Sequence, residues 1–103
     1  MKRILLITGA IALMGVTNIV KADPDMQAGK AKSERCAGCH GDNGEGDDSN
    51  PRLAGMARDQ FVKAIAEYKS GERKHTAMRN RVSKLTAQDT EDLAAYYASL
   101  RKN

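Results

Sequence analysis

The stretch Cys36-Ala37-Gly38-Cys39-His40 decides how this chain folds. Two thiols three positions apart can each add to one vinyl group of a porphyrin, and a histidine beside the second thiol is then placed beneath the iron as an axial ligand. This spacing is typical of covalent haem attachment. We therefore predict one haem c, bound covalently through Cys36 and Cys39, with His40 as the first ligand of the iron.

Three other uses of these residues have less support in the sequence. A structural zinc site needs four thiolate or imidazole ligands, but the chain has only two cysteines and two histidines, and Cys39 and His40 are adjacent. A thioredoxin-like redox pair needs a βαβ context, whereas Cys36 lies between a helical pattern and a glycine-rich loop. A disulfide between such close cysteines would close almost no loop, so it would add little stability.

The first 22 residues have the features of a secretory signal peptide. A basic start (residues 1–3) precedes an apolar run (residues 4–16), and Val20 and Ala22 occupy the two positions that a signal peptidase reads. The apolar run is shorter than the roughly 20 residues that span a bilayer, which favours cleavage after Ala22 over a retained anchor. Haem is attached to such motifs outside the cytoplasm, so the predicted location, the periplasm, agrees with the motif.

Charge is unevenly distributed along the chain. Of its 17 basic residues, three lie in residues 1–22, where there is no acid, so residues 23–103 carry 14 basic and 13 acidic groups. Within this part, residues 23–50 have a net charge of −4 and residues 51–88 a net charge of +6. Such a dipolar molecule is not typical of nucleic-acid binding proteins, and we expect no nucleic acid among its partners.

Residues 23–103 form one small predicted domain of 81 residues with few large apolar side chains. A domain of this size rarely makes an adequate core unaided and usually adds a staple, such as a metal, a disulfide or a cofactor. A buried porphyrin would supply both apolar surface and a covalent crosslink. The size of the chain therefore supports the same prediction as its motif.

The first predicted helix carries the attachment motif. Asp23 is expected as its N-cap and Pro24 as its first residue, and the helix is expected to reach about Ala37. Gly29 lies on the same face as Cys36, two turns earlier. A glycine inside a helix costs roughly 1 kcal/mol relative to alanine, which favours close approach by another helix over a tolerated weak spot.

Two further amphipathic helices are predicted. Residues 57–70 have apolar side chains at intervals of three and four, and Gly71 follows as a C-cap. Residues 86–89 resemble a capping box at the start of a terminal helix, whose apolar stripe ends at Leu100. Residues 72–77 are polar and are predicted to be irregular. No stretch shows convincing strand alternation, so the fold is predicted to be all-α, with three main helices around one haem.

An iron that only transfers electrons needs a second axial ligand, and the chain offers few candidates. Met26 and Met56 lie on or at the start of predicted helices, where methionine more often serves packing. Met78 lies in the irregular segment between two predicted helices, where a side chain can be aimed at the face of the iron opposite His40. Met78 is therefore favoured as the ligand, and His75 is the alternative.

Pro51 follows a polar loop, residues 41–49, that contains three glycines. This loop has the composition of a calcium site, but its acids do not follow calcium-loop spacing, so a solvated loop is predicted. An iron-bound imidazole normally donates its second N–H to a carbonyl or carboxylate. The carbonyl of Pro51 is a candidate for this acceptor, although the sequence alone fits a plain turn equally well.

Several motifs in this order carry a family resemblance, and it covers nearly all of residues 23–103. They are Gly29, Cys36-Ala37-Gly38-Cys39-His40-Gly41, Pro51-Arg52-Leu53-Ala54-Gly55, Tyr68-Lys69-Ser70-Gly71-Glu72-Arg73, Met78 and Leu93-Ala94-Ala95-Tyr96-Tyr97-Ala98-Ser99-Leu100. Together they resemble the short class I bacterial c-type cytochromes, and in particular one half of the dihaem periplasmic kind. The chain has a single attachment motif, so transfer between two haems of one chain is not expected.

The resemblance implies roles for residues that the motifs alone leave open. In that family a proline carbonyl binds the proximal histidine and a methionine ligates the iron, which favours Pro51 and Met78 for these roles. The first and last helices cross at a glycine–aromatic contact, which implies that Gly29 packs against Tyr96 or Tyr97.

We therefore predict a periplasmic electron-transfer protein with one haem c and His40/Met78 axial ligation. It is expected to be a monomer and not an enzyme. The expected partners are redox proteins, such as a quinol-oxidising complex, a terminal oxidase or a dehydrogenase. The alternatives are the haem subunit of one dehydrogenase, and a haem enzyme or sensor with an open iron site.

Overall fold

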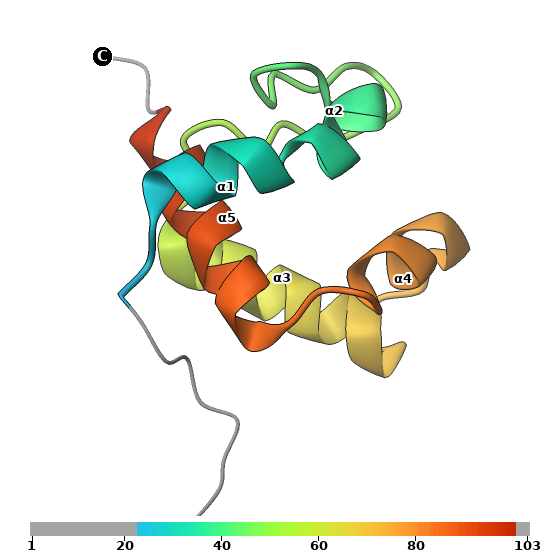
Figure 1. Cartoon of the computed structure of the whole chain (residues 1–103). Coiled ribbons are helices and arrows are strands. Elements are labelled where there is room, and N and C mark those ends of the chain that lie inside the picture. Colours follow the sequence, from blue (N-terminus) through green and yellow to red (C-terminus); the bar gives the residue numbers. More distant parts are fainter. Residues whose placement is uncertain (1–22, 101–103) are drawn as a thin grey trace, which may run out of the picture.

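The computed structural model describes residues 23–100, which form five helices and no strand (Figure 1). The helices are α1 (Met26–Lys32), α2 (Glu34–His40), α3 (Arg58–Ser70), α4 (Thr76–Val82) and α5 (Ala87–Ser99). The predicted all-α fold is confirmed. No helix in this part of the chain is long and apolar enough to cross a bilayer. The predicted signal peptide, residues 1–22, lies outside the described residues.

The entry helix starts later than the sequence predicted, and it is interrupted once. Asp25, not Asp23, is the N-cap, because the Asp25 carboxylate accepts two backbone N–H groups of the first turn at 2.9 and 3.1 Å. The interruption between α1 and α2 falls at Ser33, whose hydroxyl donates to the carbonyl of Lys30 at 2.6 Å. A hydroxyl bound to a nearby carbonyl competes with the helical hydrogen bonds, which explains why one predicted helix becomes two.

Helices α1 and α5 cross in close contact at Gly29 (Figure 1). A Cβ atom added to Gly29 would lie 2.7 Å from the Cβ of Tyr96 and would also meet the carbonyl of Asp92. Any larger residue would therefore push the two helices apart. The close approach predicted for Gly29 is confirmed, and its aromatic partner is Tyr96.

A buried carboxylate fixes the same two helices in place. Asp92 on α5 is only 3% exposed, and it accepts from the backbone N–H of Asp25 (2.9 Å), from Lys32 Nζ (2.7 Å) and from Gln88 Nε2 (3.0 Å). Lys32 also pairs with Asp89 at 2.9 Å. Burial alone would raise the pKa of Asp92, but these hydrogen bonds outweigh it and lower the pKa, while the bonds to Asp92 and Asp89 raise the pKa of Lys32.

The Asp92→Asn variant is expected to be less stable than the wild type by about 2 kcal/mol at neutral pH, since it loses charge-assisted hydrogen bonds. A carboxylate with a lowered pKa contributes stability above its ordinary pKa of about 3.9 and loses it as pH falls through the lowered value. The difference between the two proteins should therefore shrink in acid. Thermal unfolding followed by circular dichroism at several pH values measures it.

Asp59→Asn is the matched control, because the side chain of Asp59 is 98% exposed. This variant should unfold like the wild type at every pH. A deficit of Asp92→Asn that stays constant into acid would show that its charge does not stabilise the pairing of α1 with α5.

The core lies where α3, α4 and α5 meet. Phe61 on α3 stacks on Tyr97 of α5 with ring centroids 5.7 Å apart, and Val82 of α4 is 2% exposed. The ends of these helices match the sequence prediction closely. Gly71 ends α3 with a φ of 86°, a left-handed conformation that favours glycine, and Thr86 begins α5 with a complete capping box.

Candidate functional site

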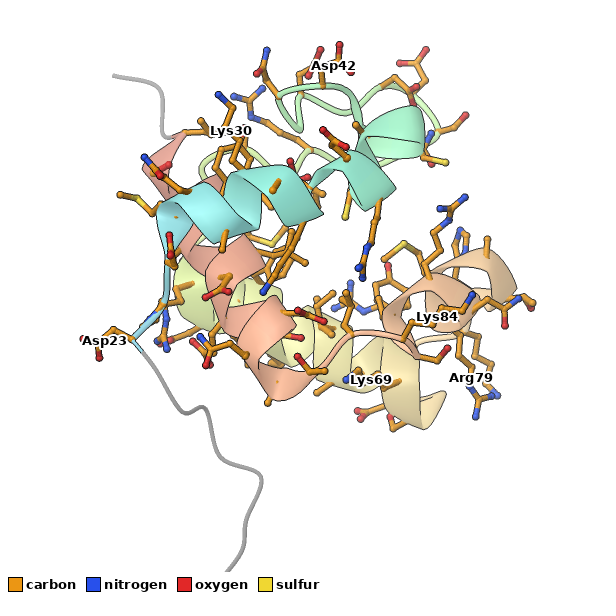
Figure 2. All side chains as sticks on the ribbon, viewed as in Figure 1. Asp23, Lys30, Asp42, Lys69, Arg79 and Lys84 are labelled. Atoms are coloured by element: carbon orange, nitrogen blue, oxygen red, sulfur yellow. The ribbon has the colours of Figure 1, made fainter. Side chains whose placement is uncertain are left out.

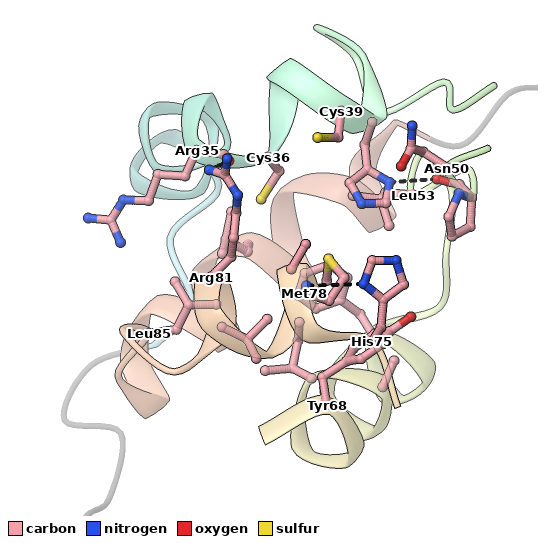
Figure 3. A pocket seen from close by; sticks show the side chains of 18 of the residues that line it. Arg35, Cys36, Cys39, Asn50, Leu53, Tyr68, His75, Met78, Arg81 and Leu85 are labelled. Carbon is pink, nitrogen blue, oxygen red and sulfur yellow. Dashed lines mark hydrogen bonds between the residues drawn. The ribbon is translucent and has the colours of Figure 1, made fainter. Parts of the chain in front are cut away.

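A pocket opens between α2 on one side and α3 and α4 on the other (Figure 3). Its walls are mainly apolar, and α3 supplies much of them because residues four apart share one face of a helix. The apolar side chains include Leu53, Met56, Phe61, Ala64, Ile65, Tyr68, Ala77, Val82, Leu85 and Leu93. All the site residues proposed from the sequence line this pocket: Cys36, Cys39, His40, Pro51 and Met78, together with the alternative ligand His75.

His40 ends α2 and is held in one orientation. Its ring is 5% exposed, and Nδ1 lies 2.7 Å from the carbonyl oxygen of Pro51. A carbonyl can only accept, so Nδ1 carries the proton and donates it to Pro51. Nε2 of the neutral ring then keeps its lone pair, which is the form of histidine that binds a metal. Pro51 thus fixes both the tautomer and the direction of the imidazole.

The two cysteines are not joined in a disulfide. Figure 3 shows the sulfur atoms of Cys36 and Cys39 on the α2 side of the pocket. Cys36 is partly buried against the core, and Cys39 is exposed. Burial raises the pKa of the Cys36 thiol, and a hydrogen bond from Tyr97 and the charge of Arg81 offset this only in part. Both thiols are placed to form bonds to one group that occupies the pocket.

Met78 lies on a helix, which corrects the prediction of an irregular segment up to this residue. Helix α4 begins at Thr76, and its N-cap is His75, whose Nδ1 accepts from the backbone N–H of Met78 at 3.3 Å. Histidine is not among the usual N-cap residues, so the sequence carried no signal for this start. Figure 3 shows Met78 and His75 both facing the pocket from the side opposite Cys36 and Cys39.

Three arginines also line the pocket: Arg35, Arg73 and Arg81. The basic residues on both sides of Met78 in the sequence indicated Arg73 and Arg81, but not Arg35. Arg81 on α4 donates to the backbone carbonyl of Arg35 on α2 at 3.3 Å, so the two helices meet at one edge of the pocket. These residues are 46 positions apart. Arg35 and Arg81 come close together only in the folded chain. In the sequence, the excess of positive charge in residues 51–88 indicates a basic surface but not this contact.

The donor set fits a covalently attached haem. The sulfur atoms of two cysteines lie on one side of an apolar pocket, a buried imidazole has an unprotonated nitrogen, and a thioether lines the same pocket from another helix. Apolar walls suit the porphyrin, and imidazole and thioether are the axial ligands of electron-carrying c-type haems. Within residues 23–100, no three side chains of histidine, cysteine, aspartate or glutamate come together as a site for a metal ion alone.

Comparison with known proteins identifies relatives of the chain. The family model for cytochrome c matches residues 26–101. The chain is 35% identical over 95 residues to cytochrome c4 of Pseudomonas aeruginosa, which is 91% of this chain and 47% of that protein. It is 30% identical over 74 residues to the cytochrome subunit of sulfide dehydrogenase of Chlorobaculum tepidum, covering 72% of this chain and 67% of that subunit.

A solved structure agrees with these matches. Cytochrome c4 of Acidithiobacillus ferrooxidans superposes with a TM-score of 0.70 at 26% identity, over 81% of this chain and 55% of that one. The chain thus spans about half the length of the cytochrome c4 proteins that it matches. The predicted resemblance to one half of a dihaem cytochrome is confirmed.

Proposed function

The chain belongs to the cytochrome c family and carries haem c through Cys36 and Cys39, and on this premise we propose that it is an electron carrier whose iron is held between His40 and Met78. When bound, the haem supplies a one-electron ferric/ferrous couple. The observation that supports this function best is the shared pocket, which His40 enters from α2 and Met78 from α4.

In the proposed function, the protein keeps both iron ligands in fixed positions. The Pro51 carbonyl orients the His40 imidazole at 2.7 Å, and the first turn of α4 supports Met78. With His40 and Met78 both holding the iron, no position would be left for a substrate, and little rearrangement would accompany the change of charge. A neutral thioether also favours the ferrous state, which raises the reduction potential. The mainly apolar walls of the pocket would limit the contact of the haem with water.

We place this carrier in the periplasm, after removal of residues 1–22. Support comes from the basic and apolar pattern of those residues and from the need to attach haem outside the cytoplasm. Mass spectrometry of the exported protein tests this proposal, and the expected N-terminus is Asp23.

The visible spectrum of the ferric protein tests the proposed ligation directly. A six-coordinate, low-spin spectrum with the weak far-red band of sulfur bound to iron is expected. A high-spin spectrum, or tight binding of a small ligand without displacement of Met78, would instead indicate an enzyme or a sensor with an open iron site.

A second candidate function is the haem subunit of one dehydrogenase. The observation that favours it is the similarity to the cytochrome subunit of a sulfide dehydrogenase, of which the chain covers 67%. A dedicated subunit would co-purify with its enzyme at high salt and in fixed proportion. A mobile carrier would be recovered alone, as a monomer, and would exchange electrons with more than one redox partner.

The basic edge of the pocket is the proposed contact with redox partners. Arg35 and Arg81 are exposed there, and none of the acidic residues of the 41–50 loop lines the pocket. Opposite charges on a partner would steer its approach, and salt screens such steering over a Debye length of about 8 Å at physiological ionic strength. The expected partners therefore present an acidic surface around their own redox centre.

Reversal of both charges, Arg35→Glu with Arg81→Glu, is expected to slow reduction by the native partner about tenfold at low salt, since steering raises association rates by factors of 10 or more. The loss should nearly vanish at high salt. Stopped-flow kinetics at several ionic strengths measures it. Lys30→Glu with Lys63→Glu changes the charge equally on residues outside the pocket, and an equal loss in this control would argue against docking at the pocket edge.

A further inference from the structure

The segment that carries Met78, residues 71–86, is attached to the last turn of α3 near each of its ends. Helix α4 packs against α3, and Figure 1 shows it beside the C-terminal end of that helix, away from α1. Met78 lies near the middle of this segment. The position of its sulfur therefore depends on how firmly the segment is attached at both ends.

The beginning of the segment is attached through Arg73. Its guanidinium donates to one carboxylate oxygen of Glu67, from Nη2 at 2.7 Å and from Nε at 3.1 Å. Its backbone N–H also donates to the carbonyl of Glu67 at 3.1 Å. The guanidinium lies over the ring of Tyr68, 5.2 Å from the centroid. Glu67 and Tyr68 together fix the chain five residues before Met78.

The end of the segment is attached through Lys69. Its Nζ donates to the backbone carbonyl of Leu85 at 2.7 Å, in the link between α4 and α5. The side chain of Leu85 is 8% exposed and lines the pocket, so this carbonyl lies close to the core. A hydrogen bond from a charged donor is stronger than a neutral one. Figure 2 shows Lys69 beside this link, with Lys84 nearby.

We infer that Glu67 and Lys69 are positioning residues, which hold the Met78 segment at both ends and so keep the thioether on the iron. This inference rests on the proposed ligation by Met78. A segment released at one end gains conformational freedom, and the thioether then competes less well with another ligand. Neither residue lines the pocket. Glu67 acts through the side chain of Arg73, and Lys69 acts through the backbone carbonyl of Leu85.

The test is a titration of the ferric holoprotein with imidazole, followed by loss of the far-red band. Lys69→Met keeps the length and apolar stem of the side chain and removes the bond to Leu85. Half-loss of the band is expected at an imidazole concentration about fivefold lower than in the wild type, the factor that corresponds to about 1 kcal/mol. Glu67→Gln should shift the midpoint in the same direction, and Lys69→Arg, which keeps a charged donor, should restore it.

Lys84→Met is the matched control, because it removes the same charge from an exposed residue that adjoins Leu85. In residues 23–100, the Lys84 side chain makes no hydrogen bond or ion pair. Its imidazole midpoint should equal that of the wild type, and so should that of Asp92→Asn, which weakens the distant pairing of α1 with α5. Equal midpoints for Lys69→Met and Lys84→Met would overturn the inference, whereas absence of the band from the wild type would overturn the ligation by Met78 itself.

Discussion

The double variant Cys36→Ala with Cys39→Ala is expected to be exported as a chain that is largely unfolded and contains no haem. Without the two thioether bonds the porphyrin is no longer held covalently, and loss of the haem leaves the apolar walls of the pocket facing water. The described part of the chain buries only nine apolar residues in its core. A domain of this size needs additional stabilisation, and without the haem this stabilisation is lost. Circular dichroism and acid–acetone extraction measure both effects, and wild-type haem should remain with the protein in the extraction.

The two substitutions remove little packing, so unfolding of the double variant would be caused by the loss of the haem. Cys39 is exposed and Cys36 only partly buried, so truncation to alanine would cost about 1 kcal/mol or less in packing. Each single variant keeps one thioether bond and should retain some haem. A wild-type protein that folds without colour would contradict the assignment of the site.

Met78→Ala is expected to abolish the far-red band and to lower the reduction potential, while the haem stays covalently attached. Alanine cannot reach the iron, so the preference of the thioether for the ferrous state is lost. Each tenfold loss of that preference lowers a one-electron potential by about 59 mV, and a total decrease of about 100 mV is expected. Redox titration followed in the visible spectrum measures it.

Met56→Ala is the matched control, since Met56 lines the same pocket and loses the same atoms. It should keep the far-red band and nearly the same potential. His75→Ala should also keep the band, because the role of His75 is to cap α4. If His75→Ala removes the axial ligand and Met78→Ala does not, the haem has two histidine ligands.

The sequence predicted the parts of the fold that depend on local chemistry. The left-handed Gly71, the capping box of Thr86 and the close packing at Gly29 each follow from one residue type with one physical property. The family resemblance added the pairing of Gly29 with an aromatic residue of the last helix. Gly71 and Thr86 are confirmed because no distant contact competes with these local signals, whereas Gly29 is confirmed through its contact with Tyr96 of the last helix.

The sequence failed where a distant contact decides local structure. The helix start moved from Asp23 to Asp25, whose N–H donates to Asp92 on the last helix. Helix α4 was missed partly because His75 is an uncommon N-cap. In addition, the hydrogen bond from Lys69 to the carbonyl of Leu85, which follows α4, comes from a different helix. Hydrophobic periodicity also fails in a helix of seven residues, which makes only two turns.

The pairing of α1 with α5 also bears on the order in which the chain folds and receives its haem. The contact between Asp25 and Asp92 joins residues 67 positions apart, so it forms only when almost the whole domain is available. In a chain that emerges from its N-terminus, the two thiols are delivered well before α5, and long-range contacts form late because loop closure must come first. During that interval Cys36 and Cys39 belong to an open segment that a haem and its attachment enzymes can reach. Arrival of the last helix then brings Asp92 and Tyr96 against the beginning of the domain.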